Sequence, residues 1–303
     1  MTTDTLTATW TTPILEHCAE LVDARYVLPE VAPRVAEALR AAAAAGRYAA
    51  CTGPEDLAVA VTAHLHELTA DLHLRLLFHA DGAMGEQDPA ALEAYWREEA
   101  RRTAGGVQRV ERTASGVGVV VLGPVLCHPA MGGDAVAAAM SLVADADALV
   151  LDVRGCRGGS PDGVVLLLSH LFEPEPVRLG DVESREGGTH QYWTQSALAG
   201  RRFGPDKPVA VLTSAETFSG GEAVAFDLQD LGRATVVGER TRGGAHPRIG
   251  VSVHPQLELS LPVARSVSPR TGGNWEGAGV LPDVEVAASD ALDTALAFLA
   301  PTA

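Results

Sequence analysis

Apolar residues recur at helical spacing through the first quarter of the chain, with polar residues at the positions between them. The pattern predicts three helices separated by short loops, over residues 14–22, 31–45 and 54–68. Helices joined by short loops pack as antiparallel neighbours, so we expect a small helical N-terminal domain over residues 1–80. Asp88 and Pro89 are typical of a helix start, which places a helical connector over residues 81–106.

The pattern changes at residue 107 to short apolar runs that alternate with helical segments. Runs without a polar face are typical of strands buried on both sides, and their alternation with helices favours parallel pairing. The predicted strands cover residues 107–111, 117–122, 148–153, 209–213 and 234–237, and the helices cover residues 130–143, 161–172, 219–231 and 287–299. We therefore expect an α/β domain over residues 107–303.

Composition and charge narrow the classes of partner. The 303 residues are 47% hydrophobic, as in an ordinary globular protein, and 39 acids against 23 bases give a net charge of −16. Nucleic acids and anionic membranes need clustered Lys and Arg, so neither is an expected partner. The polar start of the chain predicts no signal peptide, and the most apolar stretch, residues 116–126, is too short to span a bilayer.

Two residue types limit the chemistry. The four cysteines form no Cys-x-x-Cys pair, so we expect no metal site and a reduced, cytoplasmic setting. Lys207 is the single lysine, and it stands before Pro208 at the start of a predicted strand. A mechanism that needs a lysine must use this residue, which has no glycine-rich phosphate loop around it.

One junction between a strand and a helix is rich in glycine. The strand that ends near Val153 runs into Gly155-Cys156-Arg157-Gly158-Gly159, and a helix begins at Pro161. Backbone N–H groups beside a helix N-terminus suit a developing oxyanion. The alternative is a tight turn that needs glycine only for its backbone freedom.

A second junction places Ser219 before Gly220, Gly221 and Glu222, after the strand over residues 209–213. Serine at the N-cap with glutamate at the third helical position forms a capping box, which is one interpretation. The other is a nucleophile with an open approach, whose following N–H can stabilise an oxyanion.

A serine nucleophile needs a base, and two histidines are candidates. His73 lies in an alternating segment that leaves the third helix, and His246 lies in a glycine-rich loop. Either could instead be structural. Glu276, between Trp275 and a glycine, could orient a base or belong to a plain turn.

Taken together, these motifs resemble those of the C-terminal processing (tail-specific) serine peptidases. Within them, the chain is similar to the branch that includes the tricorn protease core and the interphotoreceptor retinoid-binding protein modules. The resemblance covers nearly the whole chain, in the helical region over residues 14–78 and in five ordered blocks at residues 148–161, 191–194, 212–222, 238–247 and 274–283. It implies a small helical N-terminal domain and an α/β domain of the Clp-protease/crotonase type.

Matched residue by residue, the resemblance makes Ser219 the nucleophile. Gly220 then supplies one oxyanion-hole N–H, and Gly158 or Gly159 supplies the other. Gly244 stands where peptidases with a Ser–Lys dyad have their lysine.

The tricorn-like members use a histidine and a glutamate, which His73 and Glu276 match. His246 is the alternative base or a substrate-binding residue, and Trp193 and Trp275 are further candidates for substrate binding. Three departures from the family bear on specificity: Cys156 replaces the usual asparagine, Arg157 a common glycine, and Gly220-Gly221 a pair that is usually alanine.

The function that follows from the resemblance is hydrolysis of peptide bonds through an acyl-enzyme, without a metal or cofactor. One alternative is a serine hydrolase or acyltransferase that acts on a small ester, lactone or thioester. Another is a non-catalytic binder of a lipophilic ligand. The sequence does not determine the substrate or the oligomeric state.

Overall fold

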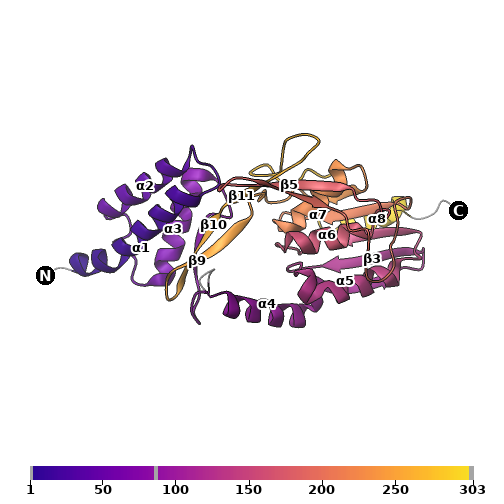
Figure 1. Cartoon of the computed structure of the whole chain (residues 1–303), viewed down its shortest axis with the longest axis horizontal. Helices are drawn as coiled ribbons and strands as arrows, with labels where there is room; N and C mark the ends of the chain where they lie inside the picture. The colour runs from indigo at the N-terminus through magenta and orange to yellow at the C-terminus, as the bar shows by residue number, and fades with distance from the viewer. Residues whose placement is uncertain (1–2, 85–87, 300–303) are drawn as a thin grey trace. The chain divides into compact units, whose positions relative to one another are not determined.

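The computed structural model of the protein describes residues 3–84 and 88–299, with side chains from residue 10 onward (Figure 1). Its contacts divide the chain into two compact units. The first unit comprises residues 1–94, 183–189 and 246–266, and the second comprises residues 95–182, 190–245 and 267–303. The domain limits expected from the sequence stay a prediction, since a compact unit need not be a segment that folds alone.

The first unit packs three helices on a small antiparallel sheet. The helices are α1 (Thr3–Arg25), α2 (Ala32–Ala44) and α3 (Pro54–Thr69). Helices α2 and α3 lie where the apolar spacing predicted them, whereas α1 begins eleven residues before the predicted start at residue 14. The sheet has the order β1-β10-β9, with β1 at Arg75–Phe78, β10 at Leu257–Pro262 and β9 at Arg248–His254. The apolar helix faces and strand residues such as Leu76 and Leu259 form one buried core.

The turn between α3 and β1 matters for the candidate site. The chain leaves α3 at Ala70, whose φ of 57° is left-handed and whose N–H still bonds to the carbonyl of His66. This sharp exit places Asp71 and His73 in the short connection to β1, where both side chains are buried.

The second unit contains a six-stranded sheet in the order β12-β8-β7-β4-β3-β2. The strands from β3 to β12 pair in parallel, and β2 pairs antiparallel at one edge. Their bounds are β2 Val107–Arg112, β3 Val117–Leu122, β4 Ala148–Asp152, β7 Val209–Thr213, β8 Thr235–Gly238 and β12 Val284–Glu285. The predicted parallel α/β arrangement is confirmed.

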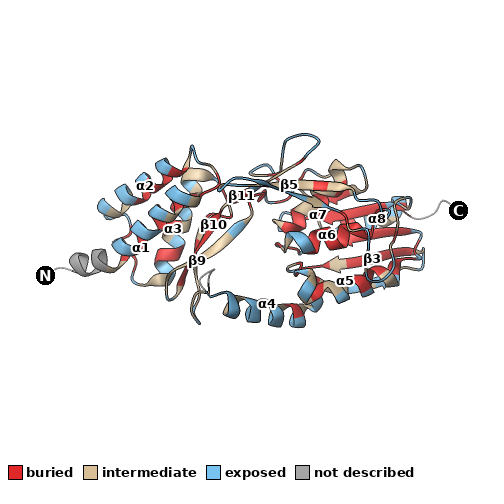
Figure 2. Cartoon of the chain, in the orientation of Figure 1, coloured by how far each residue is buried: buried red, intermediate tan, exposed pale blue. Residues whose placement is uncertain are grey.

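Helices cover both faces of this sheet, which explains why its central strands β3, β4 and β7 lack a polar side (Figure 2). Along β4, Leu149 and Leu151 point into the core formed with α5, α6 and α7, whereas Ala148 and Val150 point toward α8. The helices are α5 (Pro129–Val143), α6 (Pro161–Ser169), α7 (Gly220–Asp230) and α8 (Ala291–Leu299). Because β4 and β7 are parallel neighbours, the loops that lead to α6 and α7 both leave from the carboxyl ends of these strands, on the same side of the sheet.

The remaining elements connect these parts. Helix α4 (Pro89–Thr103) has Asp88 as its N-cap, as predicted, since the carboxylate accepts the N–H of Ala91 at 3.0 Å, and a 3-10 turn follows at Ala104–Gly106. A third sheet has the order β11-β5-β6, with β11 at Ala264–Val267, β5 at Arg178–Ser184 and β6 at Thr189–Trp193. Within the part of the chain that the structure describes, no helix is long and apolar enough to cross a membrane.

Candidate active site

Ser219 sits at the start of α7 in a strained backbone conformation. Its φ of 52° and ψ of −118° lie in a region that glycine favours and other residues avoid. Strain of this kind costs on the order of 1–3 kcal/mol and persists where the surroundings enforce it. Here the preceding Phe218 N–H is held by the carbonyl of Cys156 at 3.0 Å, and the Ser219 N–H by Glu222 at 2.8 Å. These two bonds hold the strained turn in place before α7 begins at Gly220.

The glycine-rich loop after β4 presents backbone N–H groups. Leu126 pairs with it: the Leu126 N–H donates to Gly158 at 3.1 Å, and the Ser160 N–H donates to the Leu126 carbonyl at 2.8 Å. In this parallel bridge the N–H of Gly159, between the two bonded residues, points away from Leu126. The bridge to Leu126 therefore does not use the N–H of Gly159 as a donor.

The turn that carries Ser219 and the glycine loop approach each other closely. A Cβ added at Gly220 would lie 2.8 Å from the nitrogen of Gly159, and one added at Gly158 would lie 3.8 Å from the Cβ of Ser219. The first distance is shorter than real Cβ contacts, so a side chain at position 220 would require the two backbones to move apart. The arrangement brings a half-buried serine beside backbone N–H groups, which is a geometry that can stabilise an oxyanion.

Cys156 lies in the same loop. Its thiol is buried and donates to the carbonyl of Gly158 at 3.3 Å. Burial raises the pKa of Cys156 to about 11, so the group remains a thiol at neutral pH. The side chain thus supports the turn as a hydrogen-bond donor, and its buried thiol is not suited to act as a nucleophile.

The segment that carries Glu276 is packed against the loop before His246. One carboxylate oxygen of Glu276 accepts the N–H of Ala245 at 2.5 Å. The indole N–H of Trp275 donates to the carbonyl of Gly244 at 2.9 Å, and its ring lies 4.9 Å from that of Phe226. Trp275 is buried, which gives it a packing role that the sequence did not indicate.

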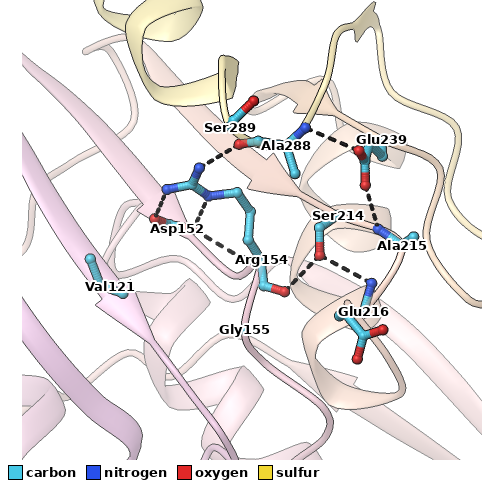
Figure 3. A pocket seen from close by; sticks show the side chains of 10 residues that line it. All are labelled: Val121, Asp152, Arg154, Gly155, Ser214, Ala215, Glu216, Glu239, Ala288 and Ser289. Carbon is cyan, nitrogen blue, oxygen red and sulfur yellow. Dashed lines mark hydrogen bonds and ion pairs between the residues drawn. The ribbon is translucent and has the colours of Figure 1, made fainter.

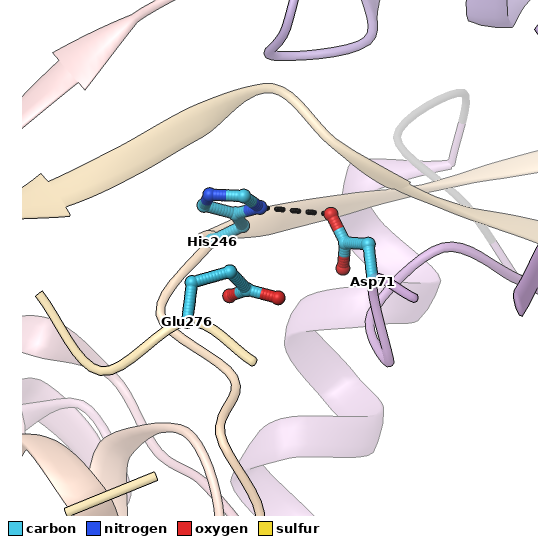
Figure 4. Close-up of side chains that lie close together, drawn as sticks. All are labelled: Asp71, His246 and Glu276. Atoms are coloured by element: carbon cyan, nitrogen blue, oxygen red, sulfur yellow. Dashed lines mark hydrogen bonds and ion pairs between the residues drawn. The ribbon is translucent and has the colours of Figure 1, made fainter. Parts of the chain in front are cut away.

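In the first unit, Asp71 is the centre of a buried polar group that sequence reasoning missed. One of its oxygens lies 2.8 Å from Nδ1 of His246 (Figure 4). The same oxygen accepts the Tyr26 hydroxyl at 3.1 Å. Its other oxygen accepts the backbone N–H of His73 at 2.9 Å. Burial alone would raise the pKa of Asp71, but the bonds and charge of His246 and the His73 N–H outweigh it and lower the pKa. Because a charged carboxylate can only accept, Nδ1 of His246 is the donor in this bond.

His73 is buried and neutral. Burial lowers the pKa of His73 to about 4, an effect that Asp71 opposes and the positive charges of Arg75 and Arg248 reinforce. Its backbone carbonyl accepts the hydroxyl of Ser260 at 2.6 Å, which anchors the connection to β10. At neutral pH the ring is therefore in the form that can accept a proton. The spacing Asp71-x-His73 was the available sequence signal for the carboxylate.

Two other residues considered from the sequence lie elsewhere. The ammonium of Lys207 donates to the carbonyl of Ala144 at the C-terminus of α5 and lies 4.0 Å from the ring centre of Phe203. Trp193, at the end of β6, is 44% exposed, with its indole N–H 3.4 Å from Gln191. Lys207 is thus held by a helix end, whereas the surface position of Trp193 leaves its part in substrate binding a prediction.

A cavity of about 520 Å³ opens beside the loops that follow β4 and β7, near the carboxyl ends of β4, β7 and β8 (Figure 3). Its charged groups are already bonded: Arg154 to both carboxylate oxygens of Asp152, and Glu239 to the N–H groups of Ala215 and Ala288. Ser219, Gly158, Gly159 and Gly220 do not line it. The cavity is therefore separate from the serine geometry described above.

Family models match most of the chain. Residues 128–286 match the model of peptidase family S41, and residues 7–100 match the N-terminal domain of peptidase S41 in eukaryotic IRBP. A carboxyl-terminal-processing protease of Synechocystis sp. (strain ATCC 27184 / PCC 6803 / Kazusa) is 29% identical over 138 residues, which is 46% of this chain. That match spans 30% of the length of the Synechocystis protein.

Solved structures share the fold. The photosystem II D1 C-terminal processing protease is 16% identical, with a TM-score of 0.55 over 91% of this chain and 92% of its own. The tricorn protease is 16% identical, with a TM-score of 0.56 over 94% of this chain and 35% of its own. The fold class expected from the sequence is thereby confirmed, as is the resemblance to the processing peptidases.

Proposed function

Because the chain belongs to peptidase family S41, we propose that it is a serine peptidase that hydrolyses peptide bonds through an acyl-enzyme on Ser219. The observation that carries the proposal is the strained turn of Ser219, packed against the Gly158-Gly159 loop. A plain N-cap needs no left-handed backbone, since the Ser160 cap of α6 has a φ of −68°. The strain at Ser219 therefore supports a role beyond capping.

In the proposed mechanism, His73 is the general base. The Ser219 hydroxyl attacks the substrate carbonyl carbon while its proton passes to the neutral imidazole, and the imidazolium then protonates the leaving amine. Glu276 holds and polarises the imidazole. Water, activated by the same base, hydrolyses the acyl-enzyme and regenerates the serine.

The proposed oxyanion donors are the N–H of Gly220 and that of Gly159, with Gly158 as the neighbouring alternative. The bridge to Leu126 supports Gly159, because that residue's N–H points away from the pairing. Removing one such donor typically lowers kcat by about 10²–10³-fold in a serine hydrolase. These backbone groups stabilise charge without metal or cofactor.

His246 is the second candidate for the base. Its bond to Asp71 supports this alternative, because a carboxylate on Nδ1 is how serine hydrolases orient their catalytic imidazole. If His73 is the base, His246 lines the substrate groove or fixes its loop. We further propose a peptide substrate and a reduced cytoplasmic setting, which the four free, buried cysteines support.

A serine-reactive fluorophosphonate probe tests the nucleophile. We expect the wild-type protein to be labelled at Ser219 and the Ser219→Ala protein to remain unlabelled and inactive on peptides. Lys207→Ala is the matched control and should label normally, because its ammonium serves the end of α5. Labelling of folded Ser219→Ala, or a loss of several orders of magnitude in Lys207→Ala, would overturn the assignment. Turnover of aryl esters without turnover of peptides would instead indicate a small-molecule hydrolase.

A further inference from the structure

Glu222, at the third position of α7, is a fully buried carboxylate that accepts four hydrogen bonds. One oxygen accepts the N–H of Ser219 and that of Gly244, both at 2.8 Å. The other accepts the Thr241 hydroxyl and the Gly243 N–H, both at 2.6 Å. Burial raises the pKa of Glu222, and these four donors oppose the rise.

Helix capping accounts for only one of these four hydrogen bonds. A capping box uses only the bond between the glutamate and the N-cap N–H, which here is that of Ser219. The other three come from residues 241–245, a segment that we call the strap. A buried carboxylate with this number of donors is rigidly held, because each lost partner leaves a buried polar group unsatisfied.

The strap is held on its other side by the segment that carries Glu276. The Ala245 N–H donates to Glu276 at 2.5 Å, the Gly277 N–H donates to Gly243 at 3.1 Å, and the Trp275 indole donates to Gly244. The strap continues directly into His246. Glu222 thus connects the backbone of Ser219 to a rigid element that leads to a candidate base.

We propose that Glu222 is a positioning residue that holds Ser219 in its reactive turn and fixes that turn against the strap. The inference rests on the proposed function of Ser219 as nucleophile. It carries a specific consequence for the oxyanion hole. Because Glu222 takes the Ser219 N–H, that group is not available to substrate, and the N–H of Gly220 is left to stabilise the oxyanion.

The test compares Glu222→Gln with Asp283→Asn. Asp283 is the matched control because it ties the other end of α7, accepting the Val236 N–H at 2.8 Å and the Gln229 amide at 2.9 Å. An amide at position 222 keeps the size but presents N–H groups to N–H donors. We expect Glu222→Gln to lower kcat and the probe-labelling rate constant by about 100-fold with KM within about threefold of wild type, the size of effect expected when an oxyanion donor is misplaced. Asp283→Asn should stay within about threefold of wild type.

The final extent of labelling separates positioning from misfolding. A misplaced nucleophile reacts slowly but to completion, whereas a misfolded fraction never reacts. If Glu222→Gln does not fold, Glu222→Asp retains the charge with a shorter reach and should show a smaller drop in rate at full extent. A labelling rate for either folded variant that equals that of Asp283→Asn would overturn the proposal. Failure of the wild-type protein to label would instead remove the proposed function itself.

Discussion

At the scale of single residues, the backbone conformation of Ser219 differs from that of an ordinary N-cap such as Ser160. A capping serine gains stability from its conformation, whereas Ser219 is held at a φ of 52° that disfavours any side chain. The proposed role of Ser219 as nucleophile accounts for this cost, because the turn would set the direction of its hydroxyl. This stored strain can be measured without any knowledge of the substrate.

We predict that Ser219→Gly is more stable than Ser219→Ala by about 1–2 kcal/mol, although both are inactive. Both variants lose the hydroxyl, but glycine adopts a positive φ without strain and alanine does not. Urea unfolding of the two proteins gives the difference directly.

Ser160, the N-cap of α6, supplies the control for that measurement because its φ is −68° and its ψ is 134°. Glycine is also the better N-cap than alanine there, so the pair Ser160→Gly and Ser160→Ala measures the preference due to capping alone. An equal preference for glycine at both positions would show that Ser219 carries no extra strain.

At the scale of elements, the distance between α7 and the glycine loop is set by Gly220. Its φ is not left-handed, so alanine fits the backbone, but the added Cβ would lie 2.8 Å from the nitrogen of Gly159. We predict that Gly220→Ala displaces this N–H and lowers kcat by about 10–100-fold, approaching the loss of one oxyanion donor. Steady-state kinetics on a peptide, with labelling rates as a second readout, measure the effect.

Gly133→Ala in α5 is the matched control for Gly220→Ala. The nearest atoms to its new Cβ lie at 3.4 Å and 3.6 Å, on Leu166 and Pro129, and these are ordinary contacts. Alanine inside a helix should stabilise the protein by up to about 1 kcal/mol and leave kcat unchanged. A normal kcat in Gly220→Ala would show that the Gly159 N–H is not part of the oxyanion hole.

The elements of the second unit could largely be predicted from the sequence. Strand β7 has the limits expected from its apolar run, residues 209–213, because a strand buried on both faces leaves a continuous signal. Strand β6 was not predicted, since its residues are mostly exposed and its apolar pattern is weak. Strand β1 owes its pairing to β10, far away in the chain, which local periodicity cannot reveal.

The candidate site divides in the same way. Ser219 and the glycine loop each lie in a local motif, so the sequence could identify both. The bond between Asp71 and His246 joins residues separated by 175 positions, and no local pattern encodes it. Of the four hydrogen bonds to Glu222, the sequence predicted only the capping-box bond to the Ser219 N–H. The other three come from the strap, which lies about 20 residues further along the chain.

At the scale of the whole molecule, the proposed mechanism draws on both compact units. Ser219, Glu276 and the glycines proposed as oxyanion donors belong to the second unit, whereas His73, His246 and Asp71 belong to the first. The proposal therefore requires the first unit to present a base to a nucleophile carried by the second. The pH dependence of labelling tests this requirement, because the two candidate bases differ in their surroundings.

With His73 as the base, the labelling rate should rise with pH around a midpoint near 4, well below the ordinary histidine value of about 6.5, because burial lowers the pKa of His73 to about 4. Below that pH the ring is protonated and cannot accept the serine proton. The same shift affects stability: between pH 6.5 and 4 the unfolded chain binds the proton and the folded chain does not, so stability falls as the pH is lowered through this window. Each labelling measurement therefore needs a parallel check of folding by circular dichroism.

Two variants identify the base. His73→Ala should nearly abolish labelling at every pH, whereas His246→Asn should retain the rise near pH 4 with weaker peptide binding. Asparagine is the better substitution at position 246, because its amide can still donate to the buried Asp71, which alanine would leave without that partner. The reverse pattern in two folded proteins would transfer the base to His246, with Asp71 as the carboxylate that orients it, and would make His73 structural. Full labelling of both variants would show that neither histidine activates Ser219, and the histidine mechanism would then have to be abandoned.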